Sequence, residues 1–292
     1  MTIGDVFSDL LPGPNEYVGL TATGSDGVRL AVRCWGNPRG PAIIFIHGFA
    51  QSGQAFVRQM RDARLAAKFH LIAYDLRGHG ASDKPLDREA YHNGRLWAED
   101  LRAVALAAEA ERPILVGWSF GGRVIWDYLR EYGEASVAGA QLVGSAWLRK
   151  PEWESAVSAA YLPLMLESDL ATNIAGTTAF LASCFATPPS GDDFARMLAY
   201  NMTQPPKVRR LIVGRPRQPE EFIVSLTLPL AFVVGEKDAH CSPQAARASA
   251  ARMSGATTLV IPNVGHSPFF EDAETFNAQL DAFAERVFAR RG

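Results

Sequence analysis

Four uninterrupted apolar runs constrain the fold of this chain more than any other feature of its sequence. They occupy residues 42–46, 71–74, 114–116 and 230–234. A strand that is apolar at every position is typical of a parallel sheet whose two faces are both covered by helices. Helical patterns lie between the runs, and the clearest one spans residues 276–287. This alternation of strands and helices predicts an α/β fold with a mostly parallel sheet.

Two parts of the sequence depart from this pattern. Residues 28–35 alternate between apolar and polar side chains, which predicts a half-exposed strand paired antiparallel with residues 17–22. Residues 147–224 contain many prolines between short helical stretches and no strand-like run. We therefore predict a core made of residues 1–146 and 225–292, with residues 147–224 inserted as a helical segment.

Composition and charge exclude several classes of partner. The 292 residues are 48% hydrophobic and carry a net charge of −2, so the chain can bury a sizeable core and has no electrostatic footprint for nucleic acid. No apolar run approaches the length of about 18 residues that a membrane helix needs. Residues 1–6 lack the basic and apolar regions of a secretory signal, and three scattered cysteines favour neither disulfides nor a zinc site. We expect a cytoplasmic protein that acts on a small molecule, without a metal or another cofactor.

The five-residue string Gly117-Trp118-Ser119-Phe120-Gly121 is the strongest indication of chemistry. It follows one of the apolar runs and precedes a helix-like segment. Gly-x-Ser-x-Gly at such a turn is a nucleophile elbow, in which a strained backbone lifts the serine hydroxyl above the sheet. The glycines let the neighbouring strand and helix approach closely. The pattern predicts Ser119 as a nucleophile.

A serine nucleophile needs a histidine to take its proton and a carboxylate to orient that histidine. Of the six histidines, His266 is the one in a loop between the apolar run 258–261 and the last helix. Asp238 follows the run 230–234 and gives the chain order serine, acid, histidine. Glu236 is the rival acid, while Asp75 precedes the serine.

Acyl transfer also needs hydrogen-bond donors for the oxyanion that develops on the substrate. One donor should be the backbone N–H of Phe120, directly after the nucleophile. The other should be the N–H of Phe49, in the loop that follows residues 43–46. His47 in the same loop is interpreted as an anchor rather than as a base.

Taken together, these motifs resemble those of the α/β-hydrolase superfamily. The resemblance covers the oxyanion loop, the loop after the fourth strand, the elbow, the acid turn and the histidine loop, at residues 47–49, 74–83, 117–122, 235–238 and 265–271. It implies a mostly parallel, eight-stranded sheet flanked by helices, with a helical cap inserted after the strand at residues 139–145. The segment 147–224 would be that cap.

Within this superfamily the chain looks most like bacterial carboxylesterases and cofactor-free haloperoxidase-type perhydrolases. The resemblance implies a serine hydrolase that cleaves small to medium carboxylic esters, with lactones as further substrates. Haloalkane dehalogenases and epoxide hydrolases are disfavoured because their nucleophile is aspartate, and hydroxynitrile lyases because they have lysine where Ser267 stands. The alternatives are a carbon–carbon bond hydrolase, a perhydrolase, and a ligand receptor with little turnover.

The substrate pocket is the least readable part of the sequence. Trp118, Trp147 and Ser145 are the candidate pocket residues, since each lies near the elbow or near the start of the inserted segment. Residues 207–217 are rich in lysine and arginine, which predicts a solvated helix face rather than a site for an anionic substrate.

Overall fold

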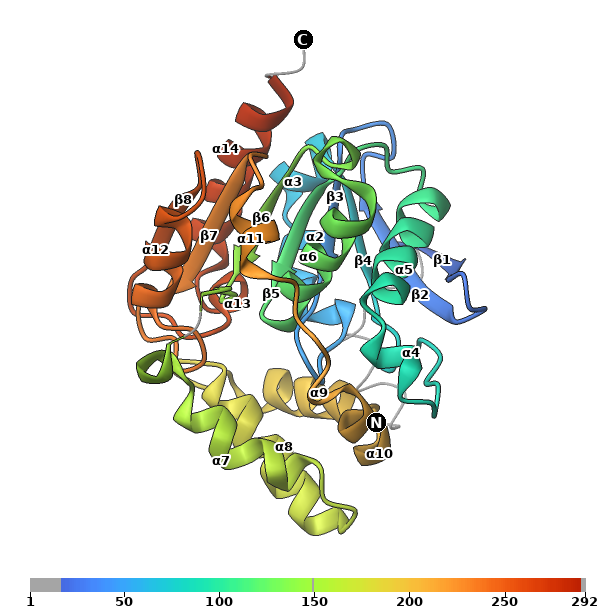
Figure 1. Ribbon diagram of the computed structural model, residues 1–292, viewed down its shortest axis with the longest axis vertical. Helices are drawn as coiled ribbons and strands as arrows, with labels where there is room; N and C mark the ends of the chain where they lie inside the picture. Colours follow the sequence, from blue (N-terminus) through green and yellow to red (C-terminus); the bar gives the residue numbers. More distant parts are fainter. Residues whose placement is uncertain (1–16, 149, 290–292) are drawn as a thin grey trace.

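A single sheet of eight strands runs through the protein (Figure 1). The computed structural model describes residues 17–148 and 150–289, so the residues of the secretory-signal prediction, 1–6, lie outside it. In spatial order the strands are β1 (Val18–Thr23), β2 (Arg29–Gly36), β4 (His70–Tyr74), β3 (Ala42–Ile46), β5 (Ile114–Trp118), β6 (Gly139–Val143), β7 (Leu230–Gly235) and β8 (Thr257–Ile261). The predicted fold class is confirmed.

Strand burial explains why the sequence patterns differ along the sheet. Every residue of β3, β4, β5, β6 and β7 is buried, and from β4 to β8 neighbouring strands pair in parallel. Strands with both faces covered need apolar residues at every position. The predicted hairpin is also confirmed, because β1 pairs antiparallel with β2 and the residues of β2 alternate in burial along most of the strand.

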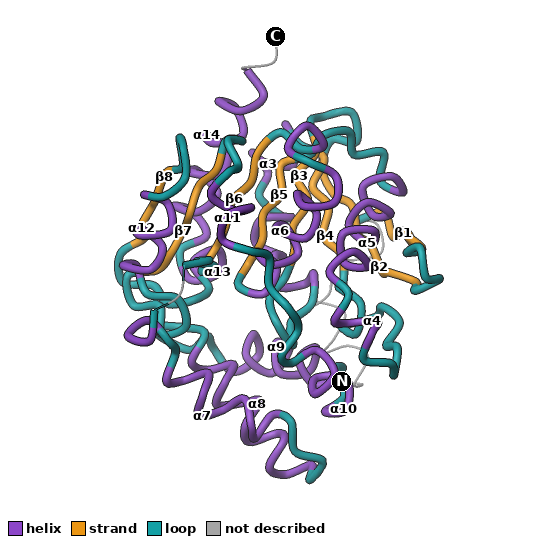
Figure 2. Tube along the Cα trace, in the orientation of Figure 1, coloured by secondary structure: helices purple, strands orange, loops and turns teal. Residues whose placement is uncertain are grey.

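Helices cover both faces of the sheet and form two apolar layers with it (Figure 2). One layer includes side chains from α5 (Gly94–Ala107), α6 (Phe120–Tyr132) and α12 (Pro243–Ala251). The other includes side chains from α2 (Val57–Met60), α3 (Ala63–Lys68), α13 (Pro268–Glu271) and α14 (Ala273–Ala289). The shorter elements are η1 (Gly53–Phe56), α4 (Glu89–His92) and η2 (Glu134–Ser136).

The described residues of the inserted segment between β6 and β7 form helices joined by loops, without a strand. Its elements are η3 (Pro151–Trp153), α7 (Ala156–Met165), α8 (Leu170–Ser183), α9 (Gly191–Met202), α10 (Pro206–Ile212) and α11 (Glu220–Val224). Figure 1 shows α7, α8, α9 and α10 below the sheet. We call these four helices the lid. The last helix, α11, instead lies beside the core, where its Ile223 joins the apolar layer of α5 and α6.

Two of the five basic residues in 207–217 are buried, which corrects the expectation of a solvated helix face for these two, while Lys207, Arg210 and Arg217 are exposed. Arg209 is fully buried inside the lid, where it donates to the carbonyls of Met165 and Asn201 at 3.1 and 2.7 Å. These carbonyls lie in the last turns of α7 and α9, whose negative dipole ends stabilise a cation. Burial lowers the pKa of Arg209 to about 10. Arg215 is also buried, and its guanidinium pairs with Asp127 of α6. The spacing of basic residues along the chain gave no sign of these contacts.

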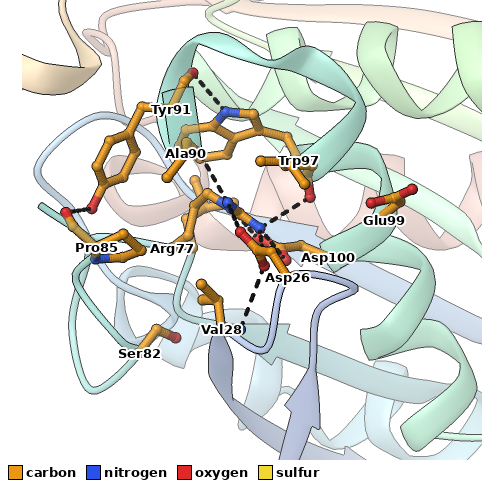
Figure 3. Close-up of polar contacts among 12 residues, drawn as sticks. Asp26, Val28, Arg77, Ser82, Pro85, Ala90, Tyr91, Trp97, Glu99 and Asp100 are labelled. Atoms are coloured by element: carbon orange, nitrogen blue, oxygen red, sulfur yellow. Dashed lines mark hydrogen bonds and ion pairs between the residues drawn. The ribbon is translucent and has the colours of Figure 1, made fainter. Parts of the chain in front are cut away.

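The loop after β4 is held by a third buried arginine, Arg77 (Figure 3). Its guanidinium makes two bonds of 2.6 and 2.8 Å to Asp100 of α5, and it also donates to Asp26 in the turn between β1 and β2. The carbonyls of Ala90 and Leu96 accept from the same group at 2.8 and 3.3 Å. Because its donors point in fixed directions, this one side chain ties the loop to the first hairpin and to α5.

Candidate active site

Ser119 occupies the turn between β5 and α6 in a strained backbone conformation. Its φ and ψ are 52° and −112°, a region that costs a residue with a Cβ about 1–3 kcal/mol. The backbone N–H of Ser119 donates to the carbonyl of Val143 on β6 at 2.8 Å. Ser145 donates its hydroxyl proton to the Ser119 carbonyl at 2.8 Å. The neighbouring strand therefore holds the elbow in the shape that its sequence pattern predicts.

The elbow glycines are required by close packing. A Cβ on Gly121 would lie 2.2 Å from the carbonyl oxygen of Ile46, and a Cβ on Gly117 would lie 2.8 Å from the carbonyl carbon of Gly121. Helix α6 thus begins in direct contact with the end of β3. This contact brings the loop after β3 beside Ser119, and a Cβ on Gly48 would lie only 3.4 Å from the Ser119 Cβ.

His266 and Asp238 meet at the carboxyl edge of the sheet. Nδ1 of His266 lies 2.9 Å from Oδ2 and 3.0 Å from Oδ1 of Asp238. Asp238 Oδ1 also accepts the backbone N–H groups of His240 and Cys241 at 2.7 and 2.8 Å, so the carboxylate is fixed. With Nδ1–H donating to this carboxylate, Nε2 carries the lone pair that a general base needs.

The two rival carboxylates have other partners. Glu236 is exposed and accepts the backbone N–H of Asn263 at 3.0 Å. Asp75 is buried and accepts the N–H groups of Gly53 and Ala81 at 2.8 and 2.9 Å, so it stabilises loops beside the site. The structure therefore brings Asp238, rather than either rival, to His266.

His47 ties the loop that carries Phe49 to the rest of the core. Its Nδ1 donates to the carbonyl of Gly48 at 2.8 Å, and its Nε2 accepts the N–H of Leu76 at 3.0 Å. Burial lowers the pKa of His47 to about 4, so the ring is neutral and these roles are fixed. Both nitrogens are engaged in loop contacts, which suits an anchor and leaves no lone pair for catalysis.

A cavity of about 460 Å³ lies between the elbow and the lid. Ser119 and His266 line it together with Phe49 and Phe120, the two residues expected to supply the oxyanion donors. The part of its wall that comes from the inserted segment is mostly apolar, with Leu148, Trp153, Ala159, Leu162, Phe180, Ile212 and Val213. Ser119 and His266 therefore face a site large enough for a small-molecule substrate.

The three predicted pocket residues do not all reach this cavity. Ser145 lines it, whereas Trp118 and Trp147 are not among the residues of its wall. Trp118 lies under the site, where its indole N–H donates to the carbonyl of His266 at 2.8 Å. Trp147 packs against the Arg252 guanidinium, 5.3 Å from the ring centroid. Both rings belong to the apolar layers on either side of the sheet rather than to the cavity wall.

Comparison with known proteins decides the family. The chain matches the alpha/beta hydrolase family over residues 43–279, which is most of its length. This protein is an alpha/beta hydrolase. The matched range contains the elbow, the acid turn and the histidine loop, and the expected membership is therefore confirmed.

The relatives of this hydrolase include esterases. A pimeloyl-[acyl-carrier protein] methyl ester esterase from Stenotrophomonas maltophilia is 30% identical over 254 residues, which cover 84% of this chain and 93% of the relative. Among solved structures, a proposed aryl esterase from Burkholderia cenocepacia is 36% identical with a TM-score of 0.86, covering 93% of this chain and all of that one. The esterase RhEst1 from Rhodococcus sp. ECU1013 is 30% identical with a TM-score of 0.84, covering 92% and 99%.

Two residues of the hydrolase site were not found from the sequence. Gly144, with φ of +52°, gives the imidazole its space, since a Cβ there would lie 2.7 Å from Nδ1 of His266. His240 lines the cavity and packs against His266. Its position two residues after the acid was the only available signal, and spacing alone does not say where a ring will pack.

The described residues of the hydrolase offer no metal site and no membrane span. Within residues 17–148 and 150–289, no three His, Cys, Asp or Glu side chains are grouped so that they could hold a metal ion. No helix of the same residues has the length and apolar character to cross a bilayer.

Proposed function

We propose that this protein is a serine carboxylesterase that cleaves small to medium esters through an acyl-enzyme on Ser119. One observation carries the proposal: the strained elbow serine lines the same cavity as a histidine whose Nδ1 lies 2.9 Å from a buried carboxylate. The esterase relatives at 30–36% identity support the same reaction class.

Each residue has a separate task in this reaction. Ser119 Oγ attacks the ester carbonyl carbon while Nε2 of His266 takes its proton, and the Asp238 carboxylate stabilises the imidazolium that forms. The N–H groups of Phe49 and Phe120 donate to the oxyanion, each worth about 3 to 4 kcal/mol by analogy with measured donors. The imidazolium then protonates the leaving alcohol. A water molecule, deprotonated by His266, then attacks the acyl carbon. The bond to Ser119 Oγ breaks, the acid leaves, and the imidazolium returns its proton to Oγ.

The cavity walls suggest which esters fit. Seven apolar residues of the inserted segment line the cavity, so an apolar acyl or alkoxy group can be buried there. A volume of about 460 Å³ suits a small molecule. We therefore take the substrate to be a small-molecule ester, with lactones as a related class.

Replacement of the nucleophile tests the proposal. Ser119→Ala should fold but lose about 10⁴- to 10⁶-fold in hydrolysis of p-nitrophenyl butyrate, because the acyl-enzyme cannot form. A phosphonate that targets activated serines should label Ser119 of the wild-type protein and no other residue, as seen by peptide mass spectrometry. Full activity in the variant, or labelling elsewhere, would contradict the proposal.

A second candidate has one observation in its favour. Arg123 and Arg217 lie in the cavity wall with Glu154, so the site carries more positive than negative charge. A carbon–carbon bond hydrolase acting on a carboxylated dione would use such an arginine to pair with the substrate carboxylate. A carboxylated dione should be cleaved faster than neutral esters if this candidate is correct. The esterase proposal expects the opposite order.

A further inference from the structure

His240 lies where the lid, the acid loop and the imidazole of His266 meet. The ring centroids of His240 and His266 are 4.7 Å apart, and their planes are inclined by 41°. Phe180 of α8 contacts His240 edge-on, with 5.2 Å between the ring centroids. The ring of His240 therefore bridges the lid and His266.

Both ring nitrogens of His240 are bound by hydroxyl groups of the lid. Ser158 of α7 lies 2.9 Å from Nδ1, and Ser183 of α8 lies 2.9 Å from Nε2. The Ser183 hydroxyl donates its only proton to the carbonyl of Phe180 at 2.6 Å, so its oxygen must accept a proton from Nε2. Nδ1 consequently accepts the proton of Ser158. The two lid helices thus fix one tautomer of His240.

The same contacts require His240 to stay uncharged. The titratable groups that face it are His266, Asp238 and Cys184, whose Sγ lies 3.9 Å from Nε2. Burial lowers the pKa of His240 to about 3, with a further lowering from His266 and an opposing effect of Asp238. At neutral pH the ring is therefore neutral, and both hydrogen bonds to the lid persist.

The backbone around His240 links the lid to the acid as well. The N–H of His240 donates to Asp238 Oδ1 at 2.7 Å. Ser155, the residue that caps α7, donates its hydroxyl to the carbonyl of Ala239 at 2.9 Å. The lid is therefore bonded to the loop that also holds the carboxylate partner of His266.

We propose that His240 is a positioning residue that transmits the seating of lid helices α7 and α8 to the imidazole of His266. The inference rests on the proposed function, because it takes His266 as the general base. Ring contact limits the rotation of His266, and the bonds to Ser158 and Ser183 keep the contacting ring in place. Without them, His266 samples orientations that do not face Ser119, which lowers kcat as well as binding.

Four variants separate the contributions of the ring and its hydrogen bonds. His240→Ala removes both, His240→Phe keeps a ring without the bonds, and the double variant Ser158→Ala/Ser183→Ala removes the bonds alone. His240→Gln should rescue, since a carboxamide can donate to one serine and accept from the other. Ser225→Ala is the matched control. This exposed serine donates to the carbonyl three residues earlier, as Ser183 does, but that carbonyl belongs to Phe222 of α11, outside the lid.

Two measurements test whether His240 positions His266. The first is kcat with p-nitrophenyl butyrate, which we expect to fall about tenfold in the Ala, Phe and double-serine variants and to stay within about threefold of wild type in His240→Gln and Ser225→Ala. The second is ¹⁵N NMR of the histidine side chains. The Nδ1–H signal of His266 should broaden or disappear in the three impaired variants and persist in the other two.

The outcomes distinguish this inference from the proposed function. A wild-type protein without ester turnover contradicts the proposed function, while the NMR signal still reports whether His240 holds His266. An unchanged kcat with an unchanged His266 signal overturns the inference, and so does a change confined to KM. If His240→Ala does not fold, the double-serine variant, which leaves the ring in place, gives the same decision.

Discussion

Two carboxylates follow β7, and their surroundings give them different roles. Asp238 is buried and bound to His266 and to two backbone N–H groups, whereas Glu236 is exposed and bound to Asn263. A charge-assisted hydrogen bond to a fixed carboxylate holds an imidazole in one tautomer. At the scale of single residues, contact with His266 therefore distinguishes Asp238 from Glu236, although both follow the same strand.

Replacing each carboxylate by its amide tests this assignment. Asp238→Asn should lower kcat by about 10⁴-fold, because an amide N–H facing Nδ1 stabilises the wrong tautomer of His266. Glu236→Gln is the matched control and should keep kcat/KM for p-nitrophenyl butyrate within about twofold. A greater loss in the Glu236 variant would show that the acid has been assigned to the wrong residue.

At the scale of elements, the site depends on how closely α6 packs against β3. Gly121 in the first turn of α6 touches the carbonyl of Ile46, while Gly191 in the first turn of α9 has no neighbour within 4 Å of its missing Cβ. An alanine relieves the entropy cost of glycine in a helix only where its methyl group has room. The two glycines therefore predict opposite effects of the same substitution.

Urea unfolding of the two glycine variants measures this difference. Gly121→Ala should lose about 1–3 kcal/mol in the free energy of unfolding, since α6 must move away from β3, and esterase activity should fall with it. Gly191→Ala should be neutral or gain up to about 1 kcal/mol. Equal stability of both variants would contradict the close approach of α6 and β3.

The inserted segment should also determine how kcat/KM depends on the length of the acyl chain. Its apolar wall should favour longer acyl chains by about 0.8 kcal/mol per methylene, which is roughly fourfold in kcat/KM. The increase should stop where the chain meets the lid helices. A p-nitrophenyl ester series from acetate to decanoate measures this profile. A strong preference for a charged acyl group, lost in Arg217→Met, would instead assign the substrate to the arginines of the cavity wall.

At the scale of the whole molecule, buried titratable groups make stability depend on pH. Burial lowers the pKa of His47 to about 4 and of His240 to about 3, and it lowers the pKa of His79 well below its ordinary value. Burial raises the pKa of Asp100 to about 6, although Arg77 acts against this. As the pH falls, the unfolded chain binds protons at these histidines before the folded protein does, so the histidines lower the free energy of unfolding. Asp100 has the opposite effect, because the folded protein binds its proton first.

One histidine can be isolated by comparing two proteins. The unfolded chain protonates His240 near pH 6.5, whereas the folded protein does so only near pH 3. As the pH falls below about 6, His240 should therefore lower the free energy of unfolding of the wild type by about 1.4 kcal/mol per pH unit. The variant His240→Phe should not show this decrease. Urea unfolding of both proteins between about pH 6 and pH 4 measures the difference. Parallel pH profiles would show that His240 has the same pKa in the folded protein as in the unfolded chain.

The local sequence determined where several strands and the elbow lie, because a strand or a turn depends on residues that are close together in the sequence. The apolar runs located β3, β4, β5 and β7, and the glycine spacing located the elbow at Ser119. Chain order singled out Asp238 and His266, which the structure places 2.9 Å apart, and their catalytic roles remain predictions. These features depend on local patterns and on the order of those patterns along the chain, so no knowledge of the packed chain was needed.

Only the tertiary structure decided what lies around those residues. Trp118 and Trp147 turn toward the core, Arg209 and Arg215 are buried, and His240 binds serines that lie 57 and 82 residues away in sequence. Such contacts depend on how the lid helices fold back over the sheet, and no periodicity records them. The cavity wall is formed by segments distant in sequence. For that reason, the sequence alone determined the fold and the candidate triad, while the packing of the lid decided the shape of the site and the partners of His240.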